Sequence, residues 1–219
     1  MEDKEQPRAT NRQARHHMVS QQEISIIACI AQNGAIGFHN HLLYHIKQDM
    51  QRFKALTTGH TVIMGRKTYQ SLPSGSLPHR RNIIVSKTMQ KEQNLQEQSE
   101  ENEPAKEVTH RDWQPSRLLA SRYEVCRTME EALDRCRTKG EEEVFIIGGA
   151  MLYRAALTLA TRLYLTIVED TPRRADTFFP LTTDEVEHLS KAGWTKVREE
   201  AHYEDKLTFR FVDMALKPQ

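Results

Sequence analysis

Short apolar segments rich in β-branched residues recur along the chain and alternate with stretches of helical periodicity. Three of them lie at 24–30 (ISIIACI), 61–64 (TVIM) and 144–147 (VFII). Such runs are typical of strands that are buried on both faces of a sheet. Further strands are predicted at 81–86 and 162–168, with helices over 46–56, 130–137 and 153–160. This alternation indicates an α/β domain around a mostly parallel sheet.

The C-terminal segment has a different pattern. Residues 194–216 alternate between apolar and polar side chains, which predicts an antiparallel hairpin with its turn near 203–205. Residues 34–40 are expected to form a loop. In open α/β sheets, ligands bind beyond the carboxyl ends of the strands. The segments to search are therefore 34–43, 65–68, 86–87 and the chain from 148 onward.

Two polar stretches flank or interrupt this pattern. Residues 1–22 have few apolar side chains and are expected to form a disordered arm, with Met18 as an alternative start to Met1. Residues 89–118 are expected to form a solvated insertion, because 90–108 are mostly Gln, Glu, Lys and Asn. A partner-binding surface is the alternative reading of this insertion. The domain is expected to span 23–216.

Composition excludes several classes of protein. Lys and Arg total 31 against 30 Asp and Glu, so the net charge of +1 gives no general attraction to nucleic acid or anionic lipid. The three cysteines have no CxxC spacing, which argues against a disulfide framework or a zinc site and fits a reducing compartment. No apolar stretch approaches the length of a membrane span, and the N-terminus lacks a secretory signal.

Asp49 is the most informative side chain. In the predicted helix, Ile46, Met50, Phe53 and Leu56 form one apolar stripe, and Asp49 falls inside it. A carboxylate that faces a core is costly unless it is paired or protonated, and burial raises its pKa. Asp49 is therefore a candidate proton-handling group. A structural carboxylate that caps or pairs locally fits the spacing equally well.

Glycines end two of the predicted strands, each directly before a helix. Gly65 precedes Arg66 and Lys67, and the pair Gly148-Gly149 follows 144–147. Such glycines let backbone N–H groups approach the pyrophosphate of a dinucleotide, and the two cations suit a 2′-phosphate, which favours NADPH over NADH. Neither segment matches GxGxxG or GxxxxGK[ST]. Alternatively, the glycines only turn the chain and the cations are solvated.

A pair of arginines, Arg80-Arg81, stands just before a predicted strand. Arginine binds a carboxylate through two parallel hydrogen bonds, so this position could hold an acidic ligand. An exposed loop arginine is the alternative.

Taken together, the chain resembles dihydrofolate reductase of the bacterial type over about 23–88 and 120–216. The matching segments, in order, are 24–30 with 35–37, Asp49 with Phe53-Lys54, 62–68, 77–82, 147–149, 163–166 and 176–180. The resemblance implies one domain with an eight-stranded sheet, helices on both faces and an antiparallel C-terminal edge hairpin. It also implies a cis bond between Gly148 and Gly149.

The resemblance implies reduction of 7,8-dihydrofolate to 5,6,7,8-tetrahydrofolate by hydride transfer from NADPH, which supplies one-carbon metabolism. Asp49 would bind the 2-amino and N3 groups of the pterin and raise the basicity of N5, with a water as the immediate proton donor. Thr166 would hydrogen-bond this acid. Leu43-Tyr44 stands where many members have Pro-Trp, so Tyr44 is the third expected catalytic residue. Arg80 would hold the glutamate α-carboxylate, and 37–42 would close over the nicotinamide as a lid.

The resemblance also implies two sets of binding residues and no metal site. The substrate-binding set is Ile27, Cys29, Met50, Phe53, Lys54, Ser71, Leu72, Leu77, Arg80, Ile147 and Tyr153. The cofactor-binding set is Cys29, Ile36, Gly37, His41, Leu42, Gly65, Arg66, Lys67, Thr68, Ser86, Lys87, Arg127, Ile147, Gly148, Gly149, Ala150, Met151, Leu152 and Tyr153. Ala150 replaces a third glycine common in bacterial members, and Met151 stands where arginine is frequent.

We expect a monomeric, cytoplasmic enzyme that binds antifolate inhibitors. We expect it to bind neither nucleic acid nor membrane. Two alternatives come from other classes. A related NADPH-dependent pteridine or pyrimidinone reductase would not need Arg80, because its substrate lacks the glutamate tail. A non-catalytic binding protein on the same fold would not need an intact Asp49–Thr166 pair.

Overall fold

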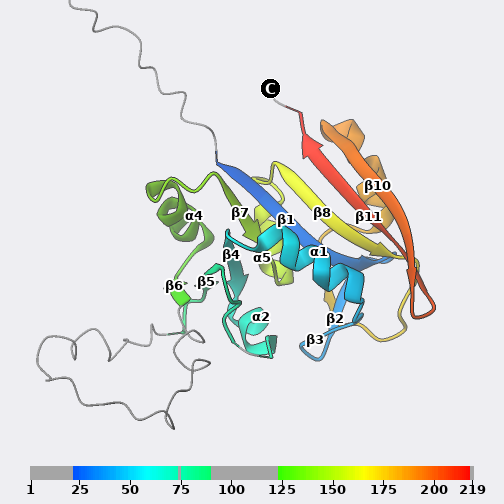
Figure 1. Cartoon of the computed structure of the whole chain (residues 1–219), viewed down its shortest axis with the longest axis horizontal. Helices are drawn as coiled ribbons and strands as arrows, with labels where there is room; N and C mark the ends of the chain where they lie inside the picture. Colours follow the sequence, from blue (N-terminus) through cyan, green and yellow to red (C-terminus); the bar gives the residue numbers. More distant parts are fainter. Residues whose placement is uncertain (1–21, 74, 90–122, 218–219) are drawn as a thin grey trace, which may run out of the picture.

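The computed structural model describes residues 22–73, 75–89 and 123–217. Its main sheet has eight strands in the order β10-β11-β8-β1-β7-β4-β5-β6 (Figure 1). The six strands from β8 to β6 are parallel where they pair, and β10 and β11 are antiparallel. Their bounds are β1 Glu23–Ala31, β4 Thr61–Gly65, β5 Arg81–Val85, β6 Tyr123–Cys126, β7 Glu143–Ile146, β8 Arg162–Val168, β10 Trp194–Glu204 and β11 Leu207–Leu216. The predicted mostly parallel sheet with an antiparallel C-terminal edge is confirmed.

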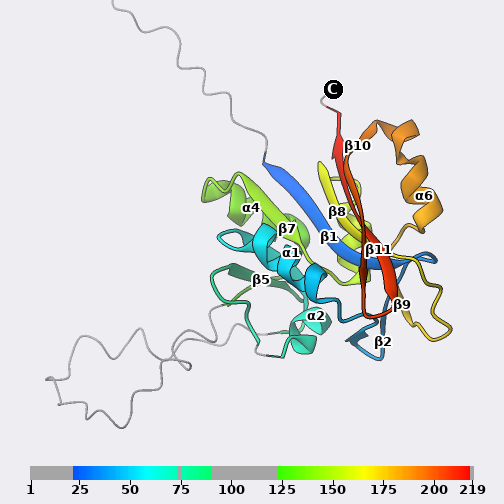
Figure 2. The ribbon, with the colours of Figure 1, turned by 45° about the vertical axis from the view of Figure 1, so that its right-hand side comes forward.

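Helices cover both faces of this sheet, as expected. Because side chains alternate along a strand, Ile24 and Ile26 of β1 face one way and Ile27 faces the other. The first face packs against α4 (Met129–Thr138), α5 (Ala150–Ala156) and α6 (Thr183–Glu187), which runs into the 3₁₀ helix η1 (His188–Ala192). The second face packs against α1 (Lys47–Thr57) and α2 (Arg66–Ser71). Figure 2 shows α1 and α6 on opposite sides of β8 and β11.

The expectation of a plain loop over 34–40 is wrong. A second, three-stranded sheet forms there in the order β3-β2-β9, from β2 (Ala35–Phe38), β3 (His41–Leu42) and β9 (Thr177–Phe178). His39 and Asn40 adopt positive φ values of 51° and 64°, which make a two-residue hairpin turn between β2 and β3. The pairing partner β9 lies far along the chain, so the local sequence contains no sign of it.

Two further elements differ from the sequence-based expectation. The helix predicted over 153–160 spans Ala150–Ala156, because it begins directly at its N-cap Gly149. Strand β6 was not predicted, and it extends the sheet by pairing with β5. The expected arm lies outside the described residues apart from Gln22, and the expected insertion lies outside them apart from Met89. Each helix in the described ranges is too short or too polar to cross a lipid bilayer.

Candidate active site

Asp49 and Thr166 meet on the α1 face of the sheet. The first turn of α1 carries Asp49, and β8 carries Thr166 at a buried position. Thr166 Oγ1 donates a hydrogen bond of 2.5 Å to Asp49 Oδ1. The two residues are 117 positions apart in the sequence, so the packing of α1 on the sheet makes this contact.

The Asp49 carboxylate is in an environment that disfavours its charge. Burial raises its pKa, and the hydrogen bond from Thr166 and the charge of Arg52 oppose that rise. Asp49 forms no ion pair with any described residue. Cys29 lies nearby on β1, and burial followed by the charge of Asp49 raises the pKa of its thiol. The Asp49 carboxylate is partly shielded from water and has no ion-pair partner among the described residues. It is therefore suited to a ligand that donates hydrogen bonds to it.

Apolar side chains gather beside Asp49. Phe53 of α1 packs against the cluster that contains Ile27, together with Leu72 and Leu77. These four were predicted to wall the substrate pocket, and the fold does bring them together. Met50 does not join the buried stripe that the helical spacing predicted, because its side chain is 42% exposed. It lies on the open side of α1, where a ligand could cover it.

Arg80 lies at the far end of α1. Its Nη1 donates to Thr57 Oγ1 at 3.1 Å, its Nε donates to the Pro78 carbonyl oxygen at 2.9 Å, and its Cζ is 6.0 Å from the centre of the Phe53 ring. Burial lowers the pKa of the guanidinium. Arg80 makes no ion pair within the described residues. Thus α1 has a carboxylate in its first turn and an unpaired guanidinium beside its last residue.

The two glycine turns predicted from the sequence lie side by side. Gly65 N donates to the Gly148 carbonyl oxygen at 2.7 Å, where β4 and β7 end. A Cβ added to Gly65 would lie 3.7 Å from Gly149 N, and one added to Gly149 would lie 3.4 Å from Thr68 Oγ1. Neither Gly65 nor Gly149 caps its helix with a side chain. The first-turn N–H groups of α2 and α5 are therefore left uncapped by their N-cap residues, and the bond between Gly148 and Gly149 is cis.

Four cations follow these strand ends. Arg66 and Lys67 follow β4, Lys87 follows β5, and Arg127 follows β6. All four are exposed, and none makes a side-chain ion pair with a described residue, although Arg127 N donates to Glu131 Oε2 at 2.7 Å. Because β7, β4, β5 and β6 are parallel neighbours, their carboxyl ends share one edge of the sheet. These strand ends combine the first N–H groups of two helices with the exposed cations Arg66, Lys67 and Lys87, which suits a phosphorylated ligand.

Comparison with known proteins decides the family. The family model described as dihydrofolate reductase matches residues 23–116 and 108–215. The dihydrofolate reductase of Neisseria meningitidis serogroup A is 37% identical over 158 residues, which is 72% of this chain and 79% of that protein. The dihydrofolate reductase type 3 of Salmonella typhimurium is 35% identical over 182 residues, 83% of this chain and 89% of that protein.

The chain belongs to the dihydrofolate reductase family. The fold agrees, since the solved dihydrofolate reductase of Enterococcus faecalis, complexed with NADP(H) and RAB-propyl, superposes with a TM-score of 0.63 at 22% identity. That match covers 88% of this chain and 95% of the solved one.

Tyr44 and Tyr153, two of the predicted site residues, use their hydroxyl groups in hydrogen bonds within the protein. Tyr44 donates to Asp170 Oδ2 at 2.9 Å, so its bond is to this carboxylate rather than to Asp49. Burial, followed by that bond, raises the pKa of Tyr44. Tyr153 is 5% exposed and donates to the Ile27 carbonyl oxygen at 2.9 Å. Tyr153 therefore supports the strand beneath the site, and a direct catalytic contact from Tyr44 stays a prediction.

The remaining predicted residues divide by exposure. Ser86 is buried, and its hydroxyl accepts from the N–H groups of Thr88 and Met89. Ile147 and Gly37 are also buried, whereas Ile36, Thr68, Ala150 and Leu152 are partly exposed. The exposed members are His41, Leu42, Lys54, Ser71 and Met151. His41 and Leu42 form β3 and are the last two residues of the lid predicted over 37–42.

Three charged residues that anchor α1 were missed by sequence reasoning. Arg52 pairs with Asp213 of β11, and both side chains are nearly buried, at 10% and 12% exposure. Glu204 of β10 accepts hydrogen bonds from Lys47 N at 2.6 Å and Gln48 N at 3.1 Å, and so caps α1 from outside the helix. The spacing of Arg52, one turn after Asp49, was the only sequence signal for this arrangement.

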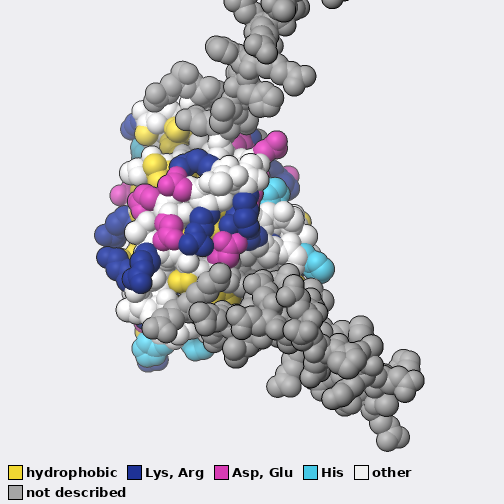
Figure 3. All heavy atoms as spheres, turned by 90° about the vertical axis from the view of Figure 1, so that its left-hand side faces the viewer, with side chains coloured by type: hydrophobic (Ala, Val, Ile, Leu, Met, Phe, Trp, Pro, Cys, Tyr) yellow, Lys and Arg dark blue, Asp and Glu magenta, His cyan; other side chains and the backbone are white. Residues whose placement is uncertain are grey.

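The surface around α4 differs in its charge from the site around Asp49. Cationic and anionic side chains are mixed on it (Figure 3). Arg81 bridges Glu124 at 2.7 Å and Glu141 at 2.6 Å, so it is an internal ion-pair residue, unlike its neighbour Arg80.

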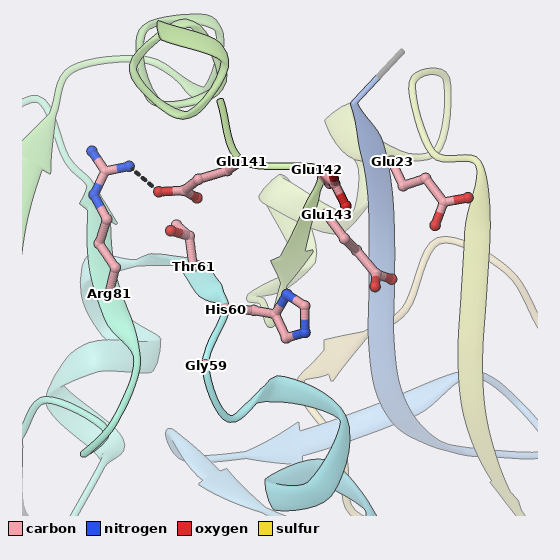
Figure 4. A pocket seen from close by; sticks show the side chains of 8 residues that line it. All are labelled: Glu23, Gly59, His60, Thr61, Arg81, Glu141, Glu142 and Glu143. Atoms are coloured by element: carbon pink, nitrogen blue, oxygen red, sulfur yellow. Dashed lines mark hydrogen bonds and ion pairs between the residues drawn. The ribbon is translucent and has the colours of Figure 1, made fainter. Parts of the chain in front are cut away.

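A hollow of about 550 Å³ lies at the opposite edge of the sheet, where β1, β4, β5 and β7 begin (Figure 4). It is lined by Glu23, Gly59, His60, Thr61, Arg81, Glu141, Glu142 and Glu143. None of the predicted site residues lines it. It is therefore separate from the site around Asp49. No group of His, Cys, Asp and Glu side chains suited to a metal ion occurs among the described residues.

Proposed function

We propose that this chain reduces 7,8-dihydrofolate to 5,6,7,8-tetrahydrofolate with NADPH, using Asp49 as the pterin-binding acid and Arg80 as the tail-binding cation. The family membership supports the reaction. The observation that carries the residue roles is the partly buried Asp49, which is hydrogen-bonded to Thr166 and has no ion-pair partner among the described side chains.

The pterin ring suits this carboxylate. A pterin has N3–H and 2-amino donors on one edge, and an ionised Asp49 can accept from both while Thr166 Oγ1 holds Oδ1. The negative charge next to the ring raises the basicity of N5, which must be protonated before the neighbouring carbon accepts a hydride. A water molecule is the proposed immediate proton donor.

The rest of the substrate suits the length of α1. Asp49 and Thr57, the residue bonded to Arg80, are eight positions apart, which is about 12 Å along a helix. Phe53 lies between them on the same face. A ligand with a donor edge at one end and a carboxylate at the other fits this spacing, and dihydrofolate has both. A reductase for a pterin without a glutamate tail would leave Arg80 unused.

The carboxyl ends of the parallel strands β7, β4, β5 and β6 form a surface that fits NADPH. Gly65, Gly148 and Gly149 would let the pyrophosphate approach the first N–H groups of α2 and α5, and a side chain at Gly149 would fill that space. Arg66, Lys67 and Lys87 would hold the 2′-phosphate. When bound, NADPH supplies the hydride. The hairpin β2–β3 would exclude water from the ring side of the site, as the predicted lid.

Substituting Asp49 by Asn tests the proposed function. Asp49→Asn keeps the size of the side chain and removes the negative charge, so kcat/KM for dihydrofolate at pH 7 should fall about 100-fold or more. NADPH affinity, measured by fluorescence titration, should be unchanged. Asp205→Asn, in the exposed turn between β10 and β11, is the matched control. Turnover of Asp49→Asn close to that of the unsubstituted protein would refute the role of Asp49.

Two finer features stay part of this proposal. The chain is proposed to act as a monomer in the cytoplasm. It is also proposed to bind neither nucleic acid nor membrane, because its near-neutral net charge offers no general electrostatic attraction to either. Antifolate inhibitors that present paired donors to Asp49 should compete with dihydrofolate.

A further inference from the structure

Two polar contacts hold α1 on the sheet, one helical turn apart. Asp49 bonds to Thr166 of β8, and Arg52 bonds to Asp213 of β11. The pairing of β8 with β11 places Thr166 opposite Phe211, and Tyr164 opposite Asp213. The three residues from Asp49 to Arg52 advance about 4.5 Å along the helix, and two residues of a strand advance about 6.7 Å. The two contacts therefore match two successive same-face positions of the sheet.

Arg52 is in an unusual position for an arginine. Its Cζ lies 4.7 Å from the centre of the Phe211 ring and 5.8 Å from that of Tyr164, and its guanidinium pairs with Asp213. Both charged side chains are nearly removed from water, so their charges are weakly screened. A buried ion pair is weak evidence for stability alone, because its desolvation offsets much of the attraction.

We infer that Arg52, whose charge Asp213 partly neutralises, is a positioning residue that keeps the Asp49 carboxylate in its ionised, pterin-binding form. This inference rests on the proposed function for its catalytic meaning. Arg52 touches neither substrate nor cofactor in this assignment. It acts through its charge on the same face of α1, three residues after Asp49.

Among the described groups around Asp49, Arg52 is the one whose charge favours the ionised carboxylate. Thr166 of β8 is a neutral donor, and Cys29 of β1 and Tyr153 of α5 are neutral groups whose pKa values are raised, first by burial. Arg52 is the cation that acts on Asp49 among the described residues. Burial favours the protonated acid, and Arg52 opposes it. Asp213 in turn partly neutralises Arg52, so the two residues should affect Asp49 with opposite signs.

Opposed substitutions test this inference. Arg52→Met removes the positive charge and should raise the pKa of Asp49 by about 0.5 to 1 unit, whereas Asp213→Asn leaves Arg52 unneutralised and should lower it by a smaller amount. Arg52→Lys, which keeps the charge, should restore most of the native value. The pKa is read by ¹³C NMR of the aspartate carboxyl groups in the full chain without ligands, and the Asp49 signal is assigned by its loss in Asp49→Asn.

The controls separate charge from structure. Lys191→Gln removes an exposed cation from η1, on the opposite face of the sheet, and should leave the Asp49 signal unchanged. A purely structural role predicts that Arg52→Met and Asp213→Asn shift the pKa in the same direction, because both break one pair. That result, or no shift in either, overturns the inference. If Arg52→Met fails to fold, Asp213→Asn decides alone, and an unchanged or raised pKa overturns it.

The activity readout is separate. The acid limb of kcat/KM for dihydrofolate should move with the NMR value in each variant. If Asp49→Asn retains turnover, the proposed function fails, while the NMR result on the charge of Arg52 still stands.

Discussion

At the scale of single residues, neighbours in the sequence take opposite roles. Arg81 begins β5 and bridges Glu124 and Glu141, so its charge is used inside the protein. Arg80, one position earlier, lies outside the strand and has no acidic partner among the described residues, although its guanidinium bonds to Thr57. A half-buried guanidinium without a carboxylate partner is suited to an acidic ligand, which is the role proposed for Arg80.

Arg80→Ala should therefore raise the KM for dihydrofolate and leave the KM for NADPH unchanged. The expected rise is about 10- to 100-fold, which corresponds to loss of a charged hydrogen-bonding pair. Steady-state kinetics with each substrate varied in turn measure it. Arg154→Ala, an exposed arginine of α5, is the control. Equal effects on both KM values would reject the assignment of Arg80 to the substrate tail.

At the scale of elements, distant segments hold two helices in register with the sheet. The N-terminal N–H groups of α1 are capped by Glu204 from the C-terminal hairpin, because the N-cap Ile46 has no side-chain acceptor. The edge strand β6 is joined to its neighbour β5 and to α4 by charge, since Glu124 bonds to Arg81 and lies near Arg135 and Lys139.

The ion pairs of Glu124 should make the free energy of unfolding depend on pH in the acid range. The hydrogen bond from Arg81 lowers the pKa of Glu124 from 4.5 to about 2. A carboxyl group with a depressed folded-state pKa stabilises the protein above its unfolded pKa, and this contribution is lost as the pH falls through the folded value. Glu124→Gln should thus lower the free energy of unfolding at pH 7 by about 1 kcal/mol, allowing for solvent screening.

The difference between Glu124→Gln and the native chain should shrink as the pH falls from 4.5 toward 2. Urea unfolding at several pH values measures it. Glu142→Gln, an exposed residue outside this network, should show no such trend. A difference that stays constant down to acid pH would show that Arg81 does not stabilise the charge of Glu124.

At the scale of the whole molecule, the start of β1 and the glycine turns of the site lie at opposite ends of the parallel strands. Strand β1 begins at Glu23, and the side chain of Gln22 donates to the Glu141 carbonyl oxygen at 2.9 Å, next to the beginning of β7. The strand ends that carry Gly65 and Gly148 are at the other edge.

Removal of residues 1–20 should consequently leave kcat and both KM values unchanged, because Gln22 and β1 are retained. A chain that starts after Ser20 can be compared with the full chain in the same assay of NADPH oxidation. A large loss of turnover would show that the segment before β1 contributes to the site.

How far the sequence predicts this molecule depends on whether a feature is local. The strands β1, β4, β5, β7 and β8 are continuous apolar runs, and burial on both faces needs little else, so their positions were predicted closely. The second sheet was not, because β2 pairs with β9 from a distant part of the chain. The helix α5 was misplaced because its start is set by Gly149, not by its apolar spacing.

The site divides in the same way. Residue type and helical period single out Asp49, and the order of the motifs identifies the family and its glycine turns. The resemblance also predicted the hydrogen bond from Thr166 to Asp49, which the structure contains. Only the packed fold shows that Met50 is exposed, and that Arg52 and Glu204 secure α1 to the last two strands. Periodicity is a property of neighbouring residues and can be read along a chain. An ion pair between positions 161 residues apart depends on how the sheet brings two strands and a helix together.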